Sequence, residues 1–350
     1  EGPYLGPMHE AAPEALHDFQ AAGADTLLSL SGKVPGLYVE STTGRIFPRF
    51  YIRGLGNIDF YLGASQPVSI IQDDVVLEHV VLKSNPVYDL DRVEVLRGPQ
   101  GSLFGRNTTA GIVKFDTIRP SDSFQGRATM SVGEYGSANI DAGFGGPIVD
   151  DLLSFRVSGL YQHRDDWVDN TYTGPSFDGT RGSFNAMGGF DDRNLRLQLR
   201  FTPTDRLTFD LSGHGRWYKG SSTLFHRGAL VKGSNSVENE PRDRVTYDEA
   251  MDNPQAYDTY GTSLRASYDF GGAVLTSISA WETTSGYSRG DTDGGAATLF
   301  AGPAFYGQSQ GNVRALDQFS QELRLASPGT GRFNWQFGGY YFDSRDTTDF

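Results

Sequence analysis

The chain contains no cysteine, so disulfide bonds and thiolate metal sites are excluded. It also has no run of about 18 consecutive apolar residues, which excludes a membrane-spanning helix. Hydrophobic residues make up only 37% of its 350 residues, a low share for a globular enzyme. Acidic residues outnumber basic residues by 43 to 30, and the formal net charge of -13 argues against binding to nucleic-acid phosphates. We therefore expect no nucleic-acid partner.

Glycine and aromatic residues are abundant, with 44 glycines and 13% aromatics. From residue 122 onward, apolar and polar residues alternate with the period of β-strands. In 194–201 one face carries Leu195, Leu197, Leu199 and Phe201, and the other carries Asn194, Arg196, Gln198 and Arg200. A transmembrane β-barrel needs no long apolar run, because its strands alternate between lipid-facing and lumen-facing residues. A soluble β-sandwich has the same alternation, so this strand alone does not decide between the two architectures.

The connections between the strands discriminate better. Compact turn sequences at 203–205, 271–272 and 327–331 alternate with long polar stretches at about 165–190, 218–258 and 285–314. This asymmetry is typical of outer-membrane barrels, and a soluble sandwich rarely needs so many long loops. We predict nine strands, near 124–133, 137–147, 152–164, 191–202, 206–218, 259–270, 273–284, 316–326 and 332–343.

The stretch RVEVLRGPQGSLFGRN at 92–107 combines a short apolar strand with a tight turn that carries arginines. Glycines at this density serve backbone with positive φ or close backbone approach, and Pro99 fixes one further dihedral angle. By itself, the combination of Gly-Pro and arginine fits many loops.

Together with three other segments, this stretch resembles the plug domain of TonB-dependent outer-membrane receptors. The segments are FYIRGLGN at 50–57, PVSIIQDDVVL at 67–77 and NTTAGIVKFDTIRP at 107–120, in the order and spacing of that family. The resemblance implies a leader or periplasmic segment at 1–19, a plug at 20–121 and the N-terminal portion of the barrel at 122–350. The expected fold is mostly β: a partial transmembrane antiparallel β-barrel preceded by a mixed α/β plug domain.

Nine strands are too few for a plugged barrel, since transporters of this type use about 22. We therefore expect the chain to be a truncated part of a longer receptor. Members of the family carry a short segment ahead of the plug, the TonB box, which the energy transducer grips by strand addition. Residues 1–20 contain no recognisable version of it. They are expected to form a leader and a short helix from about Glu14, before a helical turn at 24–30.

The resemblance also implies a latch between plug and barrel. In the family, the arginines of the IRG and LRGP elements form ion pairs with glutamates on the inner barrel wall, and the matching residues are Arg53 and Arg97. Glu322 lies on the polar face of its predicted strand and is the expected wall partner, with Glu94 as a further member. The alternative is that both arginines bind neighbouring backbone carbonyl groups.

Two further sets of site residues are expected. The plug-turn glycines are Gly54, Gly98, Gly101, Gly105 and Gly111. The lumen-facing arginines are Arg196, Arg200, Arg216 and Arg324.

No catalytic, cofactor-binding or metal site is recognised in the sequence. The six histidines lack metal-ligand spacing, and no Ser-His-Asp order, nucleotide-binding glycine loop or pair of catalytic carboxylates stands out. We therefore expect no cofactor and no enzyme activity.

The function implied by the resemblance is active import across the outer membrane of a Gram-negative bacterium. A scarce ligand would bind outside, on plug apices near Gly56–Gly63 and Leu82–Val87 and on barrel loops. The energy transducer, TonB with ExbB and ExbD, would then pull on the plug of a monomer embedded in outer-membrane lipid. A ferric siderophore or other iron complex is the expected ligand, with glycans and cobalamin as alternatives. A porin without a separate N-terminal plug and an usher with a plug inside its barrel sequence are the disfavoured alternatives.

Overall fold

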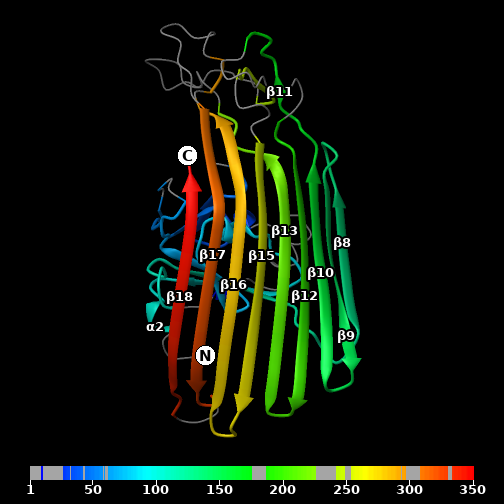
Figure 1. The fold of residues 1–350 in the computed structure, drawn as a ribbon, viewed down its shortest axis with the longest axis vertical. Coiled ribbons are helices and arrows are strands. Elements are labelled where there is room, and N and C mark those ends of the chain that lie inside the picture. The colour runs from blue at the N-terminus through cyan, green and yellow to red at the C-terminus, as the bar shows by residue number, and fades with distance from the viewer. Residues whose placement is uncertain are drawn as a thin grey trace.

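The computed structural model describes residues 9–10, 27–31, 33–41, 44–57, 59, 62–175, 187–225, 242–248, 254–292, 294–296, 308–329 and 333–350. They form a large antiparallel sheet, which we call the wall, and a smaller unit, which we call the plug. The plug consists of residues 9–10 and the described residues of 27–119. Figure 1 shows the long strands of the wall side by side, with the blue and cyan plug elements behind them on one face.

The wall is a 9-stranded sheet in the order β18-β17-β16-β15-β13-β12-β10-β9-β8. Its strands are β8 (Gln125–Val132), β9 (Ala138–Val149), β10 (Leu153–Arg164), β12 (Phe190–Thr204), β13 (Leu207–Ser221), β15 (Pro254–Asp269), β16 (Val274–Asp291), β17 (Gln308–Ala326) and β18 (Gln336–Asp349). Each strand pairs antiparallel with its neighbours, as expected for a meander in which consecutive strands join by hairpins. The predicted fold class, a partial β-barrel with a plug, is confirmed.

Several wall strands extend farther than predicted toward the end that is uppermost in Figure 1. β15 begins at Pro254 instead of 259, β16 ends at Asp291 instead of 284, and β17 begins at Gln308 instead of 316. Most residues in these extensions are polar, and their few apolar side chains, such as the buried Tyr257 and Val313, form no alternating run that would reveal a strand. Backbone pairing nevertheless continues, for example between Gln255 and Ser288. At the opposite end, β18 begins at Gln336 and not at 332.

The plug contains a 5-stranded sheet in the order β1-β6-β7-β4-β5 and a separate hairpin of β2 and β3. The strands are β1 (His9–Glu10), β2 (Leu37–Glu40), β3 (Arg49–Ile52), β4 (Val68–Gln72), β5 (Val75–Leu77), β6 (Leu90–Arg97) and β7 (Gly111–Thr117). The helical elements are η1 (Leu27–Leu30), η2 (Leu82–Ser84) and α2 (Gly101–Phe104). The helix expected from Glu14 and residues 24–26 of the expected turn lie outside the described residues. Within the described residues, no helix is long and apolar enough to cross a membrane.

The main hydrophobic core lies in the plug and reaches the wall. Phe50, Ile70, Val81 and Phe115 are fully buried, and the same cluster includes Tyr218 of β13. On the other face of the wall, apolar side chains are exposed. They include Leu195, Leu197, Phe319 and Leu323. The polar face of the wall therefore packs against the plug, and the apolar face points away from it.

Two short strands lie above the wall. β11 (Asp169–Asn170) and β14 (Arg244–Val245) form a parallel pair, although they belong to different long connections of the wall. Figure 1 shows β11 at the upper end, beyond the tips of the wall strands.

Candidate functional site

Asp89 is the centre of the contact between plug and wall. It immediately precedes β6, has a φ of 51°, and is completely buried. Arg156 of β10 donates two hydrogen bonds to its carboxylate, from Nε at 2.5 Å and from a terminal nitrogen at 2.6 Å. The Ser158 hydroxyl also donates to Asp89, and Arg127 Nε of β8 lies 3.2 Å from it. Burial acts to raise the pKa of Asp89, but the hydrogen bonds from Arg156 and Ser158 and the guanidinium charges outweigh it and lower the pKa.

Two more wall arginines bind backbone carbonyl groups of the plug. A terminal nitrogen of Arg196 in β12 donates to Tyr88 O at 3.0 Å, and its guanidinium lies 4.5 Å from the centre of the Tyr88 ring. Arg216 of β13 donates to Ser84 O at 2.9 Å and to the Ser84 hydroxyl at 2.8 Å. Asp192 neutralises Arg216 through two hydrogen bonds of 3.0 and 2.7 Å. The buried segment 84–89 is thus held by neighbouring strands of the wall.

The β4–β5 hairpin makes a second set of contacts with the wall. Asp74, at the turn, accepts a hydrogen bond of 2.6 Å from Arg265 of β15, and Lys114 lies 3.0 Å from the same carboxylate. Burial tends to raise the pKa of Asp74, but the charges of Lys114 and Arg265 lower it overall. Gln318 of β17 donates to Val76 O at 2.6 Å and accepts from the Glu78 N–H at 3.1 Å. The hairpin is therefore attached to the wall at its turn and at the C-terminal end of β5.

The four residues of the predicted latch are not brought together. Arg53 is exposed, and Arg97 donates to Pro35 O at 2.9 Å, which is the contact that the carbonyl alternative describes. Glu94 pairs with Arg92 at 3.1 Å, and Glu322 pairs with Arg324 at the same distance. Among the residues that the structure describes, no recorded ion pair joins any two of the four. The latch stays a prediction. In the buried plug–wall pair of Asp89 with Arg156 the arginine belongs to the wall, whereas Arg119 of the plug pairs with Asp210 of the wall at 3.5 Å.

The four arginines expected to face the lumen lie on the face of the wall that is turned toward the plug. Arg196 and Arg216 bind the plug directly. Arg200 pairs with Asp210 on the neighbouring strand at 2.7 Å. Arg324 lines a polar cavity of about 580 Å³ between the lower end of the plug and the wall, together with Asp74 and Lys114.

The predicted turn glycines mark irregular backbone in the plug. Four of them have positive φ, namely Gly54 at 79°, Gly98 at 102°, Gly105 at 73° and Gly111 at 146°, whereas Gly101 begins α2. Gly111 has the tightest surroundings, because a Cβ there would lie 2.2 Å from Leu96 O on the paired strand. No other residue type fits that position without displacing β6 from β7.

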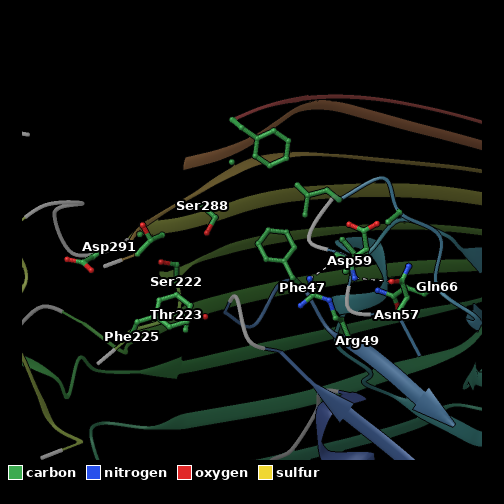
Figure 2. Close-up of a pocket in the computed structure, with 17 residues that line it drawn as sticks. Phe47, Arg49, Asn57, Asp59, Gln66, Ser222, Thr223, Phe225, Ser288 and Asp291 are labelled. Atoms are coloured by element: carbon green, nitrogen blue, oxygen red, sulfur yellow. Dashed lines mark hydrogen bonds between the residues drawn. The ribbon is translucent and has the colours of Figure 1, made fainter. Parts of the chain in front are cut away.

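A cavity of about 260 Å³ opens between the upper end of the plug and the upper tips of the wall. Figure 2 shows Phe47, Arg49, Asn57, Asp59 and Gln66 on the plug side, facing a second group on the wall side. The wall side includes Ser222, Thr223, Phe225, Ser288 and Asp291. Arg49 is buried and donates to Asp59 O at 3.0 Å. The cavity thus combines aromatic rings, hydroxyl groups and one guanidinium, which suits a compact ligand with both ring and polar surface.

The two predicted plug apices differ in their surroundings. Asn57, Asp59 and Leu62, from the segment 56–63, line the upper cavity. The segment 82–87 is not an apex, because Leu82, Ser84 and Val87 are buried against the wall and the plug core. Its apolar residues join the core, and Arg216 binds it from the wall.

Sequence reasoning did not find Asp89. The segment YDLDRVEV offers two aspartates, and nothing in the sequence alone separates the buried Asp89 from the exposed Asp91. Among the described residues, no group of three or more His, Cys, Asp or Glu side chains is placed to hold a metal ion.

The family model of the TonB-dependent Receptor Plug Domain matches residues 16–112. The chain as a whole resembles TonB-dependent receptors, in agreement with the sequence motifs. The pesticin receptors of Yersinia pestis and Yersinia enterocolitica are each 28% identical to it over 344 residues, covering 96% of this chain and 45% of each receptor. The chain therefore spans about half the length of the curated relatives it matches.

Solved structures of TonB-dependent receptors share the fold. The ferric yersiniabactin uptake receptor FyuA from Yersinia pestis superposes with a TM-score of 0.79 at 22% identity, over 99% of this chain and 49% of that one. The ferric-catecholate import receptor Fiu from E. coli K12 superposes with a TM-score of 0.69 at 15% identity, over 97% and 47% of the two chains. At identities of 22% and 15%, these two comparisons show that the fold of plug and wall is shared.

Proposed function

We propose that the protein is a TonB-dependent outer-membrane receptor that imports a ferric siderophore. The observation that carries the proposal is the upper cavity, which is built jointly by the plug and the wall. A ligand bound there touches the element that a transducer would move as well as the fixed wall. Ligand occupancy and plug displacement would therefore be coupled through shared contacts.

The surface of the wall supports placement in the outer membrane of a Gram-negative bacterium. Leu195 and Leu323 are each 51% exposed on the face turned away from the plug, whereas the opposite face carries buried arginines. Exposed leucines on one face of an antiparallel wall suit contact with lipid. We assign TonB with ExbB and ExbD as the energy-transducing partners, a monomer as the working unit, and transport without catalysis as the activity. The domain boundaries proposed for this unit are 20–121 for the plug and 122 onward for the barrel.

Relatives support the choice of an iron chelate as ligand. A solved neighbour is a ferric yersiniabactin uptake receptor, and a ferric enterobactin receptor of Pseudomonas aeruginosa is 25% identical over 203 residues, which is 54% of this chain and 25% of the receptor. The described cavity lining adds a chemical argument. It carries one cation, Arg49, and two carboxylates, Asp59 and Asp291, so a ferric chelate of low net charge suits it better than a polyanion.

Uptake of radiolabelled iron tests the function. The intact protein would be expressed in a Gram-negative strain that lacks its own siderophore receptors, and supplied with ferric yersiniabactin or ferric enterobactin. We expect uptake that requires both the protein and TonB, and that the iron-free siderophore inhibits poorly. The control is the same strain with its TonB gene deleted, in which binding persists but uptake stops. Uptake of cobalamin or a glycan without uptake of either iron complex would contradict the proposed ligand.

A further inference from the structure

Two long connections of the wall are joined above the upper cavity into one small unit. We call this unit the cap and define it by residues 167–172, 187 and 244–248. Val168, Met187, Val245 and Tyr247 form its own hydrophobic cluster. The connections also pair through β11 and β14, where Asp169 lies opposite Arg244 and Asn170 opposite Val245. Segments more than 70 residues apart in the sequence are thus held in fixed register.

Asn170 is the polar centre of the cap. Its side chain is buried, and its Nδ2 donates to Tyr247 O at 2.9 Å. Its Oδ1 accepts from the Tyr247 N–H at 3.0 Å and from the Tyr172 N–H at 3.2 Å. One amide therefore satisfies both backbone groups of a residue on the other connection. Loss of this amide would leave the backbone N–H and C=O of Tyr247 without their partner in a buried place, which is costly.

Tyr247 extends the contact from the cap to the cavity. Its side chain is completely buried in the cap, and its hydroxyl donates to Phe225 O at 2.5 Å. Phe225 lines the upper cavity on the wall side, as Figure 2 shows. A third connection reaches the same place, because Ala296 N–H donates to Thr246 O. A continuous series of contacts thus links Asn170 to a side chain that would touch the ligand.

We propose that Asn170 is a positioning residue for the ligand cavity. It fixes Tyr247, and Tyr247 in turn fixes the backbone of Phe225 in the orientation that completes the cavity wall. Asn170 itself does not line the cavity and acts through these two residues. The proposal rests on the proposed function only for the identity of the ligand, since the contacts themselves involve no ligand.

The expected effect of Asn170 on ligand affinity follows from preorganisation of Phe225. If Phe225 is held in place before the ligand arrives, the ligand does not have to order it, and affinity is higher for that reason. Asn170→Ala should free Phe225 and weaken binding by about tenfold. Tyr247→Phe removes only the hydroxyl and keeps the ring in the cap, so it should weaken binding by about threefold to tenfold. The double variant should bind no more weakly than Asn170→Ala alone, because both substitutions interrupt one series of contacts.

The absence of cysteine from the chain allows a measurement that needs no ligand. Spin labels on cysteines introduced at Ser65, exposed on the plug, and at Thr223, beside Phe225, report the distance across the cavity. We expect a narrow distance distribution in the intact parent protein, and a broader one with Asn170→Ala and with Tyr247→Phe. Asn334→Ala is the matched control, since Asn334 lies at the opposite end of the wall in a short connection. It should change neither the distribution nor the affinity.

Affinity for ferric yersiniabactin is then measured in the same variants without labels. Broader distributions together with weaker, non-additive binding support the role of Asn170. Unchanged distributions in both variants would overturn it, and so would broader distributions with unchanged affinity, because Asn170 would then only stabilise the cap. If the parent protein binds no ferric chelate, the proposed function fails, and the distance distributions alone decide for or against the positioning role.

Discussion

Asp89 of the plug and Arg156 of the wall form a buried ion pair with two hydrogen bonds, at 2.5 and 2.6 Å. The guanidinium is 3% exposed and the carboxylate is not exposed at all. The two residues are 67 positions apart in the sequence, so the pair joins the two parts of the molecule. Among the plug–wall contacts described above, it is the one in which most charge is removed from water.

Asp89→Asn should loosen the plug strongly. Asparagine tolerates the positive φ of Asp89, so the substitution removes mainly the charge and leaves Arg156 buried without its counter-ion. Removal of one member of a buried pair costs about 3–5 kcal/mol. The urea midpoint of plug unfolding, followed by pulse proteolysis in detergent, measures the loss.

Asp91→Asn is the control for this substitution, because Asp91 is exposed and only two positions away. A midpoint for Asp89→Asn equal to that of the control would refute the importance of the pair. Adding Arg156→Met to Asp89→Asn should recover part of the loss, since no unpaired guanidinium then remains in the interface.

Gly111→Ala should prevent normal pairing of β6 with β7. A Cβ at this position would lie 2.2 Å from Leu96 O, and the φ of 146° is unfavourable for any L-residue with a side chain. Backbone strain and overpacking together should cost roughly 2–5 kcal/mol of plug stability. Amide hydrogen exchange of the peptides covering β6 and β7 provides the measurement. Gly101→Ala is the matched control, because the nearest atom to its Cβ is 3.8 Å away, and it should leave exchange unchanged.

Lys83 should make plug stability depend on alkaline pH. Burial lowers the pKa of Lys83 to about 8, although the charge of Glu78 acts in the opposite direction. The unfolded chain has the ordinary lysine pKa of 10.5, so between these two values the unfolded state binds more protons than the folded state. The free energy of unfolding should therefore rise as the pH increases from about 8 to 10.5. Below pH 8 the contribution of Lys83 to the free energy of unfolding should not change with pH.

Lys83→Met should abolish this rise, whereas Lys33→Met, at an exposed lysine, should preserve it. Urea midpoints at neutral and alkaline pH, measured with a protease active over the whole range, make the comparison. An identical pH profile for Lys83→Met and the parent protein would show that the Lys83 ammonium is not the cause.

The charge of the cavity lining predicts which ferric chelates compete best. Because Arg49 is the one cation beside Asp59 and Asp291 in the described lining, a trianionic tris-catecholate complex should bind at least about tenfold more weakly than a ferric chelate of low net charge. Competition against a fluorescent ferric complex measures the difference. Added salt should narrow it, because screening weakens the repulsion of the polyanion. Equal or tighter binding of the trianion would count against the charge argument.

Much of the wall could be predicted from sequence, because its alternation has a direct physical cause. One face of β12 meets the plug and the other does not, so Leu195, Arg196 and Leu197 alternate without exception. The upper extensions of β15 to β17 could not be predicted in this way. Most side chains of these segments are polar, and hydrogen bonding between backbones leaves no periodic trace in side chains such as Gln255 and Ser288.

The candidate site was less accessible from sequence. Family motifs placed the plug and drew attention to Arg53 and Arg97, but the recorded contacts of the interface involve Asp89, Arg156 and Arg196. Long-range pairs of this kind depend on which strands become neighbours, which no local pattern specifies. The contact between Asn170 and Tyr247 is of the same type, because it joins two connections whose compositions resemble ordinary polar loops.

Arg196 and Arg216 bind the plug through main-chain oxygens of Tyr88 and Ser84. An oxygen of this kind is supplied by every amino acid, so these two attachments survive when the side chains at 84 and 88 change. What they require is a backbone that follows the same path past the wall. A chimaera that carried a foreign plug with that path would inherit both attachments without any matching substitution in the barrel. The pairs of Arg156 with Asp89 and of Arg265 with Asp74, in contrast, would require an aspartate at each of those two plug positions.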